Sequence, residues 1–332
     1  MSTTTDREQV VSELRQAEKL LLTTHENPDG DALGSLLGMH EILTQLGKDS
    51  LMFMVGDEFP LPYEYRHLQL DGVINEPPAD LTERTVVFLD CGNIDRMPVD
   101  FLQNDDLHVV NIDHHHDNTR FGTVNLVCGH ASCTAEMVFG LGKQLGAELT
   151  QKMAEALYVG LVTDTGKFMF DNTTPEAHQM AAELIEAGVS PAEIHRRLYE
   201  GLPYARTQLL ARALARVSRF DDGAVTMTHL TRDDFTESNA VETDSEGIVD
   251  HLRAVENTAV AVLVRDLLAA DRAGWRKASL RATDDRVDVS RIAREFSGGG
   301  HRQAAGFSSR LPLPELAERV RAAVSAQLND PS

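Results

Sequence analysis

The sequence predicts an α/β fold, with a Rossmann-like parallel sheet in the N-terminal domain and a smaller C-terminal α/β domain. Short apolar runs at residues 20–24, 86–89 and 109–112 are bounded by turn residues, a pattern typical of strands buried on both faces of a parallel sheet. Segments with helical periodicity lie between these runs, which indicates βαβ units. Acidic residues and histidines follow the runs, at the end of the strand where open α/β sheets bind ligands.

The N-terminal elements follow from the spacing of the apolar residues. We expect a helix over residues 6–17 and a strand over residues 20–24. Leucines recur at helical spacing from Leu33 to Leu46, and Gly47 follows, as is usual just beyond a helix end. A second helix is therefore expected over about residues 31–46. The remaining elements of this domain are strands over residues 51–55, 85–90 and 108–113 and helices over residues 134–145, 151–162 and 176–187.

The pattern of apolar and polar residues changes beyond Asp221. Residues 224–230 alternate like a strand, and a strand over residues 259–264 is expected to pair with one over residues 275–282. Helices are expected over residues 192–199, 204–217, 245–255, 289–296 and 313–327. The predicted organisation is a domain over residues 1–190, a helical linker over residues 191–222 and a second domain over residues 223–330.

The chain is strongly acidic, with 52 Asp and Glu against 31 Lys and Arg in 332 residues and a net charge of −21. This balance argues against long duplex nucleic acid as a partner, because such a partner needs a basic stripe. It leaves room for a short phosphate ligand held by a few arginines and a metal ion. The excess of acid fits either an ordinary solvated surface or a high-salt cytoplasm, and stability that rises with molar salt would favour the second interpretation.

No apolar run approaches the roughly 18 residues that a membrane span needs, and residues 1–9 lack the features of a secretory signal. We therefore expect a cytoplasmic protein without a membrane partner. The cysteines Cys91, Cys128 and Cys133 cannot all pair with one another, and their spacing matches no zinc pattern. Reduced thiols that pack as small apolar side chains are the expected state.

The strongest single motif is the loop after the first strand. It contains His25, Asp29 and Asp31, with Pro28 and Gly30 favouring a tight turn. Such a loop can aim all three side chains inward, and oxygen ligands mixed with imidazole suit Mn²⁺ or Mg²⁺. The alternative is a turn whose aspartates only cap a helix, since Asn-Pro and Asp-Gly are common turn sequences.

Other acidic residues lie at the ends of later strands and of a helix. Asp90 follows the run at residues 86–89, Asp113 and His114 follow the run at residues 109–112, and Asp164 stands at a helix end. Each alone could be a cap or a turn residue. Carboxylates gathered in one crevice repel one another unless a cation lies between them, so together they predict a metal site.

These motifs, in their order and rough spacing, resemble the four motifs of the DHH phosphoesterase superfamily. The matching segments are residues 25–32, 89–90, 113–115 and 163–166. The tail around residues 298–301 resembles the DHH-associated C-terminal domain, so that the two resemblances cover nearly the whole chain. Within the superfamily the chain is most similar to the NrnA-like group, which degrades very short RNA (nanoRNA) and dephosphorylates 3′-phosphoadenosine 5′-phosphate (pAp).

The resemblance implies two divalent ions as cofactors, with Mn²⁺ preferred and Mg²⁺ or Co²⁺ as alternatives. Each ion would have its own ligands and share one bridging carboxylate with the other. His25 and Asp29 would hold one ion, Asp31, His114 and Asp164 the other, and Asp90 would bridge them.

The remaining site residues of the N-terminal domain are also implied by the resemblance. Asp113 would orient a histidine through its ring N–H, and His115 would contact the scissile phosphate or assist the leaving group. Ser132 and Thr134, in a Ser/Thr-rich turn that the family shares, would contact the substrate. Cys133 stands where a serine is commoner in the family.

The C-terminal glycine run is a second candidate site. Gly298, Gly299 and Gly300 would offer backbone N–H groups that can cradle a phosphate, and His301 and Arg281 would add charge-assisted contacts. A flexible glycine loop is the alternative, and the same tail domain also occurs in alanyl-tRNA synthetases. Together with the N-terminal motifs, this tail is expected to hold the substrate, with the active site in the cleft between the domains.

The expected function is a two-metal phosphoesterase that hydrolyses short single-stranded RNA to mononucleotides, with pAp as a second candidate substrate. Hydrolysis of linear or cyclic dinucleotides stays open as an alternative, and so does, from another class, a catalytically inactive nucleotide-binding regulator. An inorganic pyrophosphatase is less favoured because the tail lacks that family's basic motif, and RecJ-type exonucleases are usually longer. A homodimer is compatible with the sequence.

Overall fold

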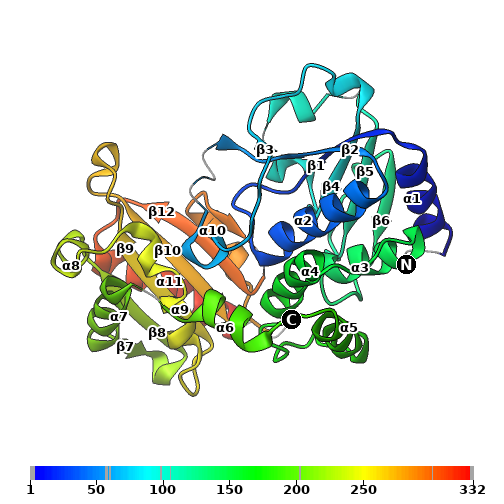
Figure 1. The fold of residues 1–332 in the computed structure, drawn as a ribbon. Coiled ribbons are helices and arrows are strands. Elements are labelled where there is room, and N and C mark those ends of the chain that lie inside the picture. The colour runs from blue at the N-terminus through cyan, green and yellow to red at the C-terminus, as the bar shows by residue number, and fades with distance from the viewer. Residues whose placement is uncertain are drawn as a thin grey trace. The chain divides into compact units, whose positions relative to one another are not determined.

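The computed structural model describes residues 4–56, 59, 61–97, 99–104, 106–201, 203–300 and 302–329. The chain divides into two compact units, Met1–Glu200 and Gly201–Ser332, each with its own sheet (Figure 1). No helix among the described residues is long and apolar enough to cross a membrane. The three cysteines are buried and free, as the sequence predicts.

The first unit is built on a six-stranded sheet whose strand pairs are all parallel. In spatial order the strands are β3 (Val73–Ile74), β2 (Asp49–Phe53), β1 (Lys19–Thr23), β4 (Thr85–Leu89), β5 (Val109–Asp113) and β6 (Val124–Val127). This order is typical of dinucleotide-binding folds, and it reverses between β1 and β4, where open α/β sheets bind ligands.

Apolar side chains cover both faces of this sheet. Leu20 and Leu22 of β1 pack into one hydrophobic cluster with the helices, whereas Leu21 packs on the opposite face with Phe88 and with side chains from loops. This double burial explains why the strands are continuous apolar runs. The helices of the unit are α1 (Thr4–Gln16), α2 (Gly30–Gln45), α3 (Thr134–Leu145), α4 (Gln151–Asp164), α5 (Pro175–Glu186) and α6 (Pro191–Tyr199).

Helices α2 and α4 approach each other closely through glycines. A Cβ atom added at Gly34 of α2 would lie 2.4 Å from the carbonyl oxygen of Ala156 in α4. A Cβ atom at Gly160 of α4 would lie 2.7 Å from Ala135 Cβ and 2.8 Å from Asp31 Oδ1. The contact therefore brings the end of α4 against the start of α2, where the predicted ligands lie.

We expect Gly34→Ala to lower the free energy of unfolding by about 1–3 kcal/mol, because the new methyl group overlaps backbone that cannot move aside cheaply. Gly140→Ala is the matched control: it also lies within a helix, but its Cβ would meet only the mobile end of Arg7, at 3.0 Å. That change should be neutral or stabilise by up to about 1 kcal/mol. Urea unfolding of both variants measures the difference, and equal effects would contradict the close approach of α2 and α4.

The second unit contains a mixed six-stranded sheet. In spatial order the strands are β11 (Gly299–Gly300), β12 (Ala304–Ser309), β10 (Arg276–Ala282), β9 (Val260–Asp266), β8 (Val225–Leu230) and β7 (Ser218–Phe220). Strands β8 and β9 are parallel, and the other pairs are antiparallel. The predicted pairing of the strands now labelled β9 and β10 is confirmed. The helices are α7 (Tyr204–Ala215), α8 (Arg232–Ser238), α9 (Ile248–Arg253), α10 (Val289–Glu295) and α11 (Leu313–Leu328).

The second unit also departs from the predicted elements. The helix expected over residues 245–255 is a 3-10 turn (Glu242–Ser245) followed by α9, because Gly247 between them has a left-handed backbone with φ +75°. Helix α8 and strand β12 were not predicted. Strand β12 pairs with Gly299 and Gly300, so these glycines form a short edge strand rather than an open loop.

A buried carboxylate in the second unit gives a pH-dependent prediction. Asp234, which is 1 % exposed, accepts hydrogen bonds from the Thr231 backbone N–H and hydroxyl, both at 2.7 Å, and from Arg216. Burial by itself would raise the pKa of Asp234, but the bonds from Arg216 and Thr231 outweigh it and hold the pKa below its usual range.

Since the folded-state pKa is the lower one, the contribution of Asp234 to stability is complete above about pH 4 and is lost as the pH falls further. Asp234→Asn should therefore lower the free energy of unfolding by about 1.5–3 kcal/mol at neutral pH. The difference in the free energy of unfolding between Asp234→Asn and the unmodified protein should narrow below about pH 4. Urea unfolding over this pH series tests both points, with the exposed neighbour Asp233→Asn as control. A gap that stays constant on acidification would contradict the assignment.

Candidate metal centre

The predicted ligands come from elements that end at one edge of the first sheet. His25 and Asp29 lie in the loop between β1 and α2, and Asp90 directly follows β4. Because β1 and β4 are neighbours in the sheet, the loop and Asp90 meet where the strand order reverses. His114 directly follows β5, and Asp164 is the last residue of α4.

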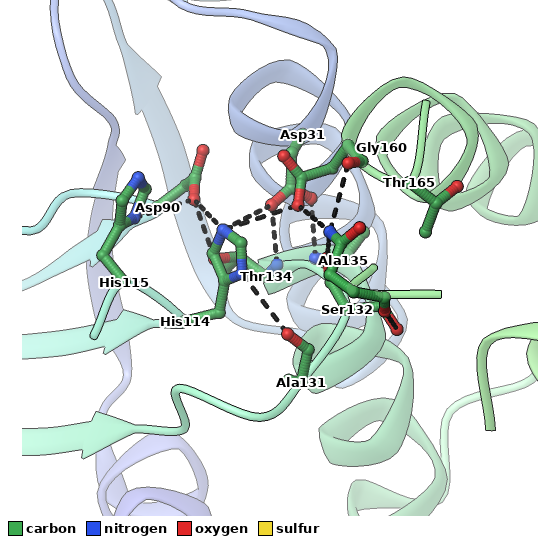
Figure 2. Close-up of polar contacts among 12 residues, drawn as sticks. Asp31, Asp90, His114, His115, Ala131, Ser132, Thr134, Ala135, Gly160 and Thr165 are labelled. Carbon is green, nitrogen blue, oxygen red and sulfur yellow. Dashed lines mark hydrogen bonds and ion pairs between the residues drawn. The ribbon is translucent and has the colours of Figure 1, made fainter. Parts of the chain in front are cut away.

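Asp90 lies at the centre of the cluster and is 2 % exposed. Its backbone adopts φ +57°, a conformation that L residues rarely adopt and that is common at functional sites. Its Oδ2 is 3.7 Å from His25 Nε2, and its Oδ1 is 3.6 Å from His114 Nε2. The Thr134 hydroxyl donates to the same Oδ1 at 3.0 Å. Asp90 thus faces His25 through one carboxylate oxygen and His114 through the other, while Thr134 fixes its orientation. Figure 2 shows the side of Asp90 that faces His114.

Both of these histidines are oriented by backbone carbonyl groups. His25 Nδ1 is 2.7 Å from the carbonyl oxygen of Glu26, and His114 Nδ1 is 3.4 Å from that of Ala131. A ring N–H at Nδ1 that donates to a carbonyl leaves Nε2 with a free lone pair, which is the usual arrangement of histidines that bind metals. In each ring it is Nε2 that faces the carboxylates.

Asp31 ties α2 to the start of α3. Its Oδ2 accepts the Thr134 N–H at 2.6 Å, its Oδ1 accepts the Ala135 N–H at 2.8 Å, and the Ser35 hydroxyl lies 3.3 Å from Oδ1. The backbone N–H groups at a helix N-terminus carry partial positive charge and favour a carboxylate there. Figure 2 shows Asp31 between these N–H groups and His114, whose Nε2 is 4.0 Å from Oδ2.

Asp164 is held by Asn172, which the sequence did not indicate. The Asn172 side-chain amide donates to Asp164 Oδ2 at 3.2 Å and to the Ser132 carbonyl at 2.8 Å. The same carboxylate oxygen is 3.6 Å from His114 Nε2. Asn172 belongs to a polar turn before α5, and nothing in a single sequence distinguishes it from an ordinary turn residue.

Asp113 and His115 form a pair beside the cluster. His115 Nδ1 is 2.7 Å from Asp113 Oδ1, and Asn118 donates to the other oxygen of Asp113 at 2.5 Å. Burial alone would lower the pKa of His115, but the hydrogen bond and charge of Asp113 raise it to about 9. Because Nδ1 faces Asp113, Nε2 of His115 remains available for another partner.

The carboxylates of the cluster repel one another. Burial, with the charges of Asp90, Asp164 and Asp29, raises the pKa of Asp31 well above its usual value. Burial also raises the pKa of Asp164, to about 6, against the opposing effect of His114. For Asp90 burial acts in the same direction, but the contact with His25 at 3.7 Å and the nearby His115 and His114 outweigh it, and the pKa of Asp90 lies below its usual range.

The donor set fits divalent metal ions. Among the described residues, the possible ligand atoms fall into three groups, and the atoms within each group lie within 4.8 Å of one another: His25 with Asp29 and Asp90, Asp31 with His114 and Asp164, and Asp90 with His114 and His115. Carboxylate oxygens combined with imidazole nitrogens suit hard to borderline divalent ions. Asp90 belongs to one group with His25 and Asp29 and to another with His114, so its carboxylate lies next to proposed ligands of both ions.

Comparison with known proteins identifies the family. Residues 19–161 match the model of the DHH family, N-terminal domain, and residues 225–330 match that of the DHHA1 domain. A curated Thermus thermophilus protein, named bifunctional oligoribonuclease and PAP phosphatase NrnA, is 35% identical over 97% of this chain and 95% of its own length. The chain belongs to the DHH family.

Two further proteins are similar to this chain, one in sequence and one in fold. A Bacillus subtilis protein that carries the same name is 29% identical over 88% of this chain and 89% of its own length. The crystal structure of an exopolyphosphatase-related protein from Bacteroides fragilis superposes with a TM-score of 0.86 at 22% identity, covering 98% of this chain and 96% of the other. This structural likeness shows that the two share a fold.

In this DHH-family chain the hydroxyls of Ser132 and Thr134 are both fully buried. The Ser132 hydroxyl donates to the Asn172 carbonyl at 2.6 Å, and that of Thr134 is bonded to Asp90. Each hydroxyl is thus engaged within the protein. We therefore expect these residues to act through Asn172 and Asp90 rather than through the predicted direct contact with substrate.

The predicted substrate residues of the DHHA1 domain lie on and beside β10 and β11. Arg281 of β10 is part-exposed, with its Nε 3.6 Å from Asp250 Oδ1. Gly299 and Gly300 are exposed, and Gly298, just before β11, packs against Gly306 and Phe307. His301 lies outside the described residues.

Proposed function

We propose that this DHH-family chain is a two-metal phosphoesterase that hydrolyses short oligoribonucleotides to mononucleotides and converts pAp to AMP. The central observation is the position of Asp90, which faces His25 through one carboxylate oxygen and His114 through the other. The Thermus thermophilus relative, similar over nearly its whole length and named for both activities, supports this choice of substrates.

Six residues would hold the ions: His25, Asp29, Asp31, Asp90, His114 and Asp164. When bound, two divalent ions supply positive charge that polarises the phosphate ester and lowers the pKa of the attacking water. Mn²⁺ is the ion we propose, because the mixed carboxylate and imidazole set suits it, with Mg²⁺ and Co²⁺ as alternatives. The Thr134 hydroxyl and the N-terminus of α3 would keep Asp90 and Asp31 in place for this task.

His115 is the proposed acid of the reaction. Asp113 accepts a hydrogen bond from Nδ1 and so fixes the ring, and Asn118 in turn fixes Asp113. Nε2 is then free to donate a hydrogen bond to a phosphate oxygen or a proton to the leaving oxygen of the ribose. Such positioned acid catalysis contributes about 10²–10⁴-fold to a rate.

Substrate binding by the second domain completes the proposal. Arg281, Gly298, Gly299, Gly300 and His301 would contact the phosphates or the bases of a short strand, as the likeness to the DHHA1 domain suggests.

The proposal also includes the domain organisation and the compartment. The metal-binding domain would span residues 1–190, the helical linker residues 191–222 and the substrate-binding domain residues 223–330. The cytoplasm is the proposed compartment, and a homodimer is compatible with this assignment.

The test is release of mononucleotides from an end-labelled trinucleotide in the presence of Mn²⁺, with pAp assayed in parallel. Both substrates should be turned over, and a linear dinucleotide should be cleaved as well. Inorganic pyrophosphate and a cyclic dinucleotide serve as competing substrates. A preference for pyrophosphate over the trinucleotide would refute the proposal, and so would nucleotide binding without turnover.

A further inference from the structure

The loop that follows the predicted ligand Asp164 has an unusual backbone. Three consecutive residues, Gly166, Lys167 and Phe168, adopt left-handed conformations with φ of 55°, 63° and 62°. Residues other than glycine rarely adopt this conformation, and it persists only where the surrounding structure enforces it. Strained segments of this kind concentrate at functional sites.

Two side chains of the loop anchor it to the first unit. The Phe168 ring stacks on His178 with a centroid distance of 4.9 Å and an interplanar angle of 23°. The Lys167 ammonium group lies 4.4 Å above the ring of Tyr199. Within the loop, the backbone N–H groups of Met169 and Phe170 both donate to the Thr165 carbonyl at 3.0 Å. These contacts attach the loop to α5 and α6.

The next two side chains point outward. Met169 is 72% exposed and Phe170 is 49% exposed. Phe168 packs against the hydrophobic core, but among the described residues neither Met169 nor Phe170 belongs to a hydrophobic cluster. The two residues thus form an adjacent exposed pair of large apolar side chains outside these clusters, and contiguous exposed apolar surface can mark a binding site.

Phe170 is exposed but held in place. A Cβ atom added at Gly166 would lie 2.5 Å from three atoms of the Phe170 ring, so the ring rests on the Gly166 backbone, where only glycine fits. At the other end of the loop, Asn172 is bonded to the Asp164 carboxylate. The position of the ring is thus tied to the position of the predicted metal ligand.

We propose that Met169 and Phe170 form the contact surface for a nucleobase of the substrate, on the nucleotide adjacent to the phosphate at Asp164. This inference rests on the proposed function and adds to it the residues that recognise the base. Every base has a π-face that stacks on an aromatic ring, and a thioether adapts to aromatic partners of different shape. The pair would therefore distinguish nucleotides from base-free phosphate esters without selecting one sequence.

The experiment combines two substrates with five proteins. The substrates are a trinucleotide and the same ribose-phosphate chain without bases, and their binding is measured by equilibrium dialysis with Mn²⁺. The linkages of both substrates are methylenephosphonates, so that no cleavage is expected, and the five proteins are the unmodified chain and its Phe170→Ala, Phe170→Tyr, Met169→Ala and Ile185→Ala variants. Ile185 of α5 is a matched control because it is a 44% exposed apolar residue of the same unit.

Phe170→Ala should weaken binding of the trinucleotide about tenfold and binding of the base-free chain less than about twofold. Phe170→Tyr, which keeps the ring, should restore binding, Met169→Ala should cause a smaller loss, and Ile185→Ala should change nothing. Equal losses for both substrates would overturn the inference, since they would mean a structural effect on Asp164. Unchanged binding together with loss of a dimer would also overturn it, since the pair would then join two copies of the chain.

The two proposals fail separately. If the unmodified protein does not hydrolyse the trinucleotide, the proposed function fails, whereas the binding comparison still decides whether Phe170 contacts a base. If hydrolysis proceeds but Phe170→Ala affects both substrates alike, the proposed function stands and the base contact is refuted.

Discussion

Asp90→Asn is expected to reduce trinucleotide turnover by about 10³-fold or more, because Asp90 is the carboxylate proposed to hold both ions, and the two ions together would stabilise the attacking and the leaving oxygen. Asp90 is the residue that faces both His25 and His114. Asparagine has nearly the same shape and can still accept the Thr134 hydroxyl, so the substitution removes charge with little change in packing.

The measurement is the rate of mononucleotide release at saturating Mn²⁺, with circular dichroism to show that the variant is folded. Asp95→Asn, an exposed acid shortly after Asp90 in the chain, is the control and should retain full activity. A folded Asp90→Asn protein with unreduced turnover would exclude the two-metal arrangement.

Removal of metal by a chelator is the second expected large effect. Turnover should stop and should return when Mn²⁺ is restored in excess. Removal of the metal should also lower thermal stability. Without an ion, burial and neighbouring charge oppose the ionisation of Asp31 and Asp164 and raise their pKa values. An ion that binds only the folded protein stabilises it by about 2.7 kcal/mol at a concentration one hundred times its dissociation constant.

Thermal unfolding with and without Mn²⁺ measures this coupling. The rise in melting temperature on adding Mn²⁺ should be much smaller in Asp90→Asn, which lacks the shared carboxylate, and unchanged in Asp95→Asn. An equal rise in all three proteins would place the bound ions outside the cluster.

The clustering of the N-terminal acids could be predicted because parallel strands end at the same edge of a sheet. Asp90, Asp113 and His114 all follow apolar runs, and the loop from His25 to Asp31 follows another. These runs alone could not predict that β1 and β4 are neighbours in the sheet, since strand order depends on tertiary packing. The resemblance to the DHH motifs supplied that link, and the parallel pairing of β1 with β4 now provides its structural basis.

The contacts that support the ligands were harder to predict. Thr134 reaches Asp90 and Asn172 reaches Asp164 only because α3 and the loop before α5 fold back onto the site. Ser132 was expected to contact substrate, but its hydroxyl is buried against Asn172. A polar residue in a turn has the same sequence signal whether it faces a ligand or another residue of the protein.

The glycine run illustrates a different difficulty. Strand β12 has the sequence Ala-Ala-Gly-Phe-Ser-Ser, in which small and polar residues hide the alternation that identifies a strand. Without β12 as a partner, Gly299 and Gly300 read as an open loop. Once β12 is present, they pair with it at the edge of the sheet.

The hydrogen bonds of Asp31 affect which substitutions can give an inactive protein that still folds, whether they are made in the laboratory or arise during evolution. Its two oxygens accept two different backbone N–H groups, and asparagine offers only one acceptor oxygen, so its amide would direct an N–H at another N–H. If Asp31 holds a metal ion as proposed, loss of catalysis and loss of folding would coincide at position 31. At Asp29, which is exposed and uses only Oδ1 to cap α2, asparagine caps equally well, and an inactive but intact protein can arise by a single step.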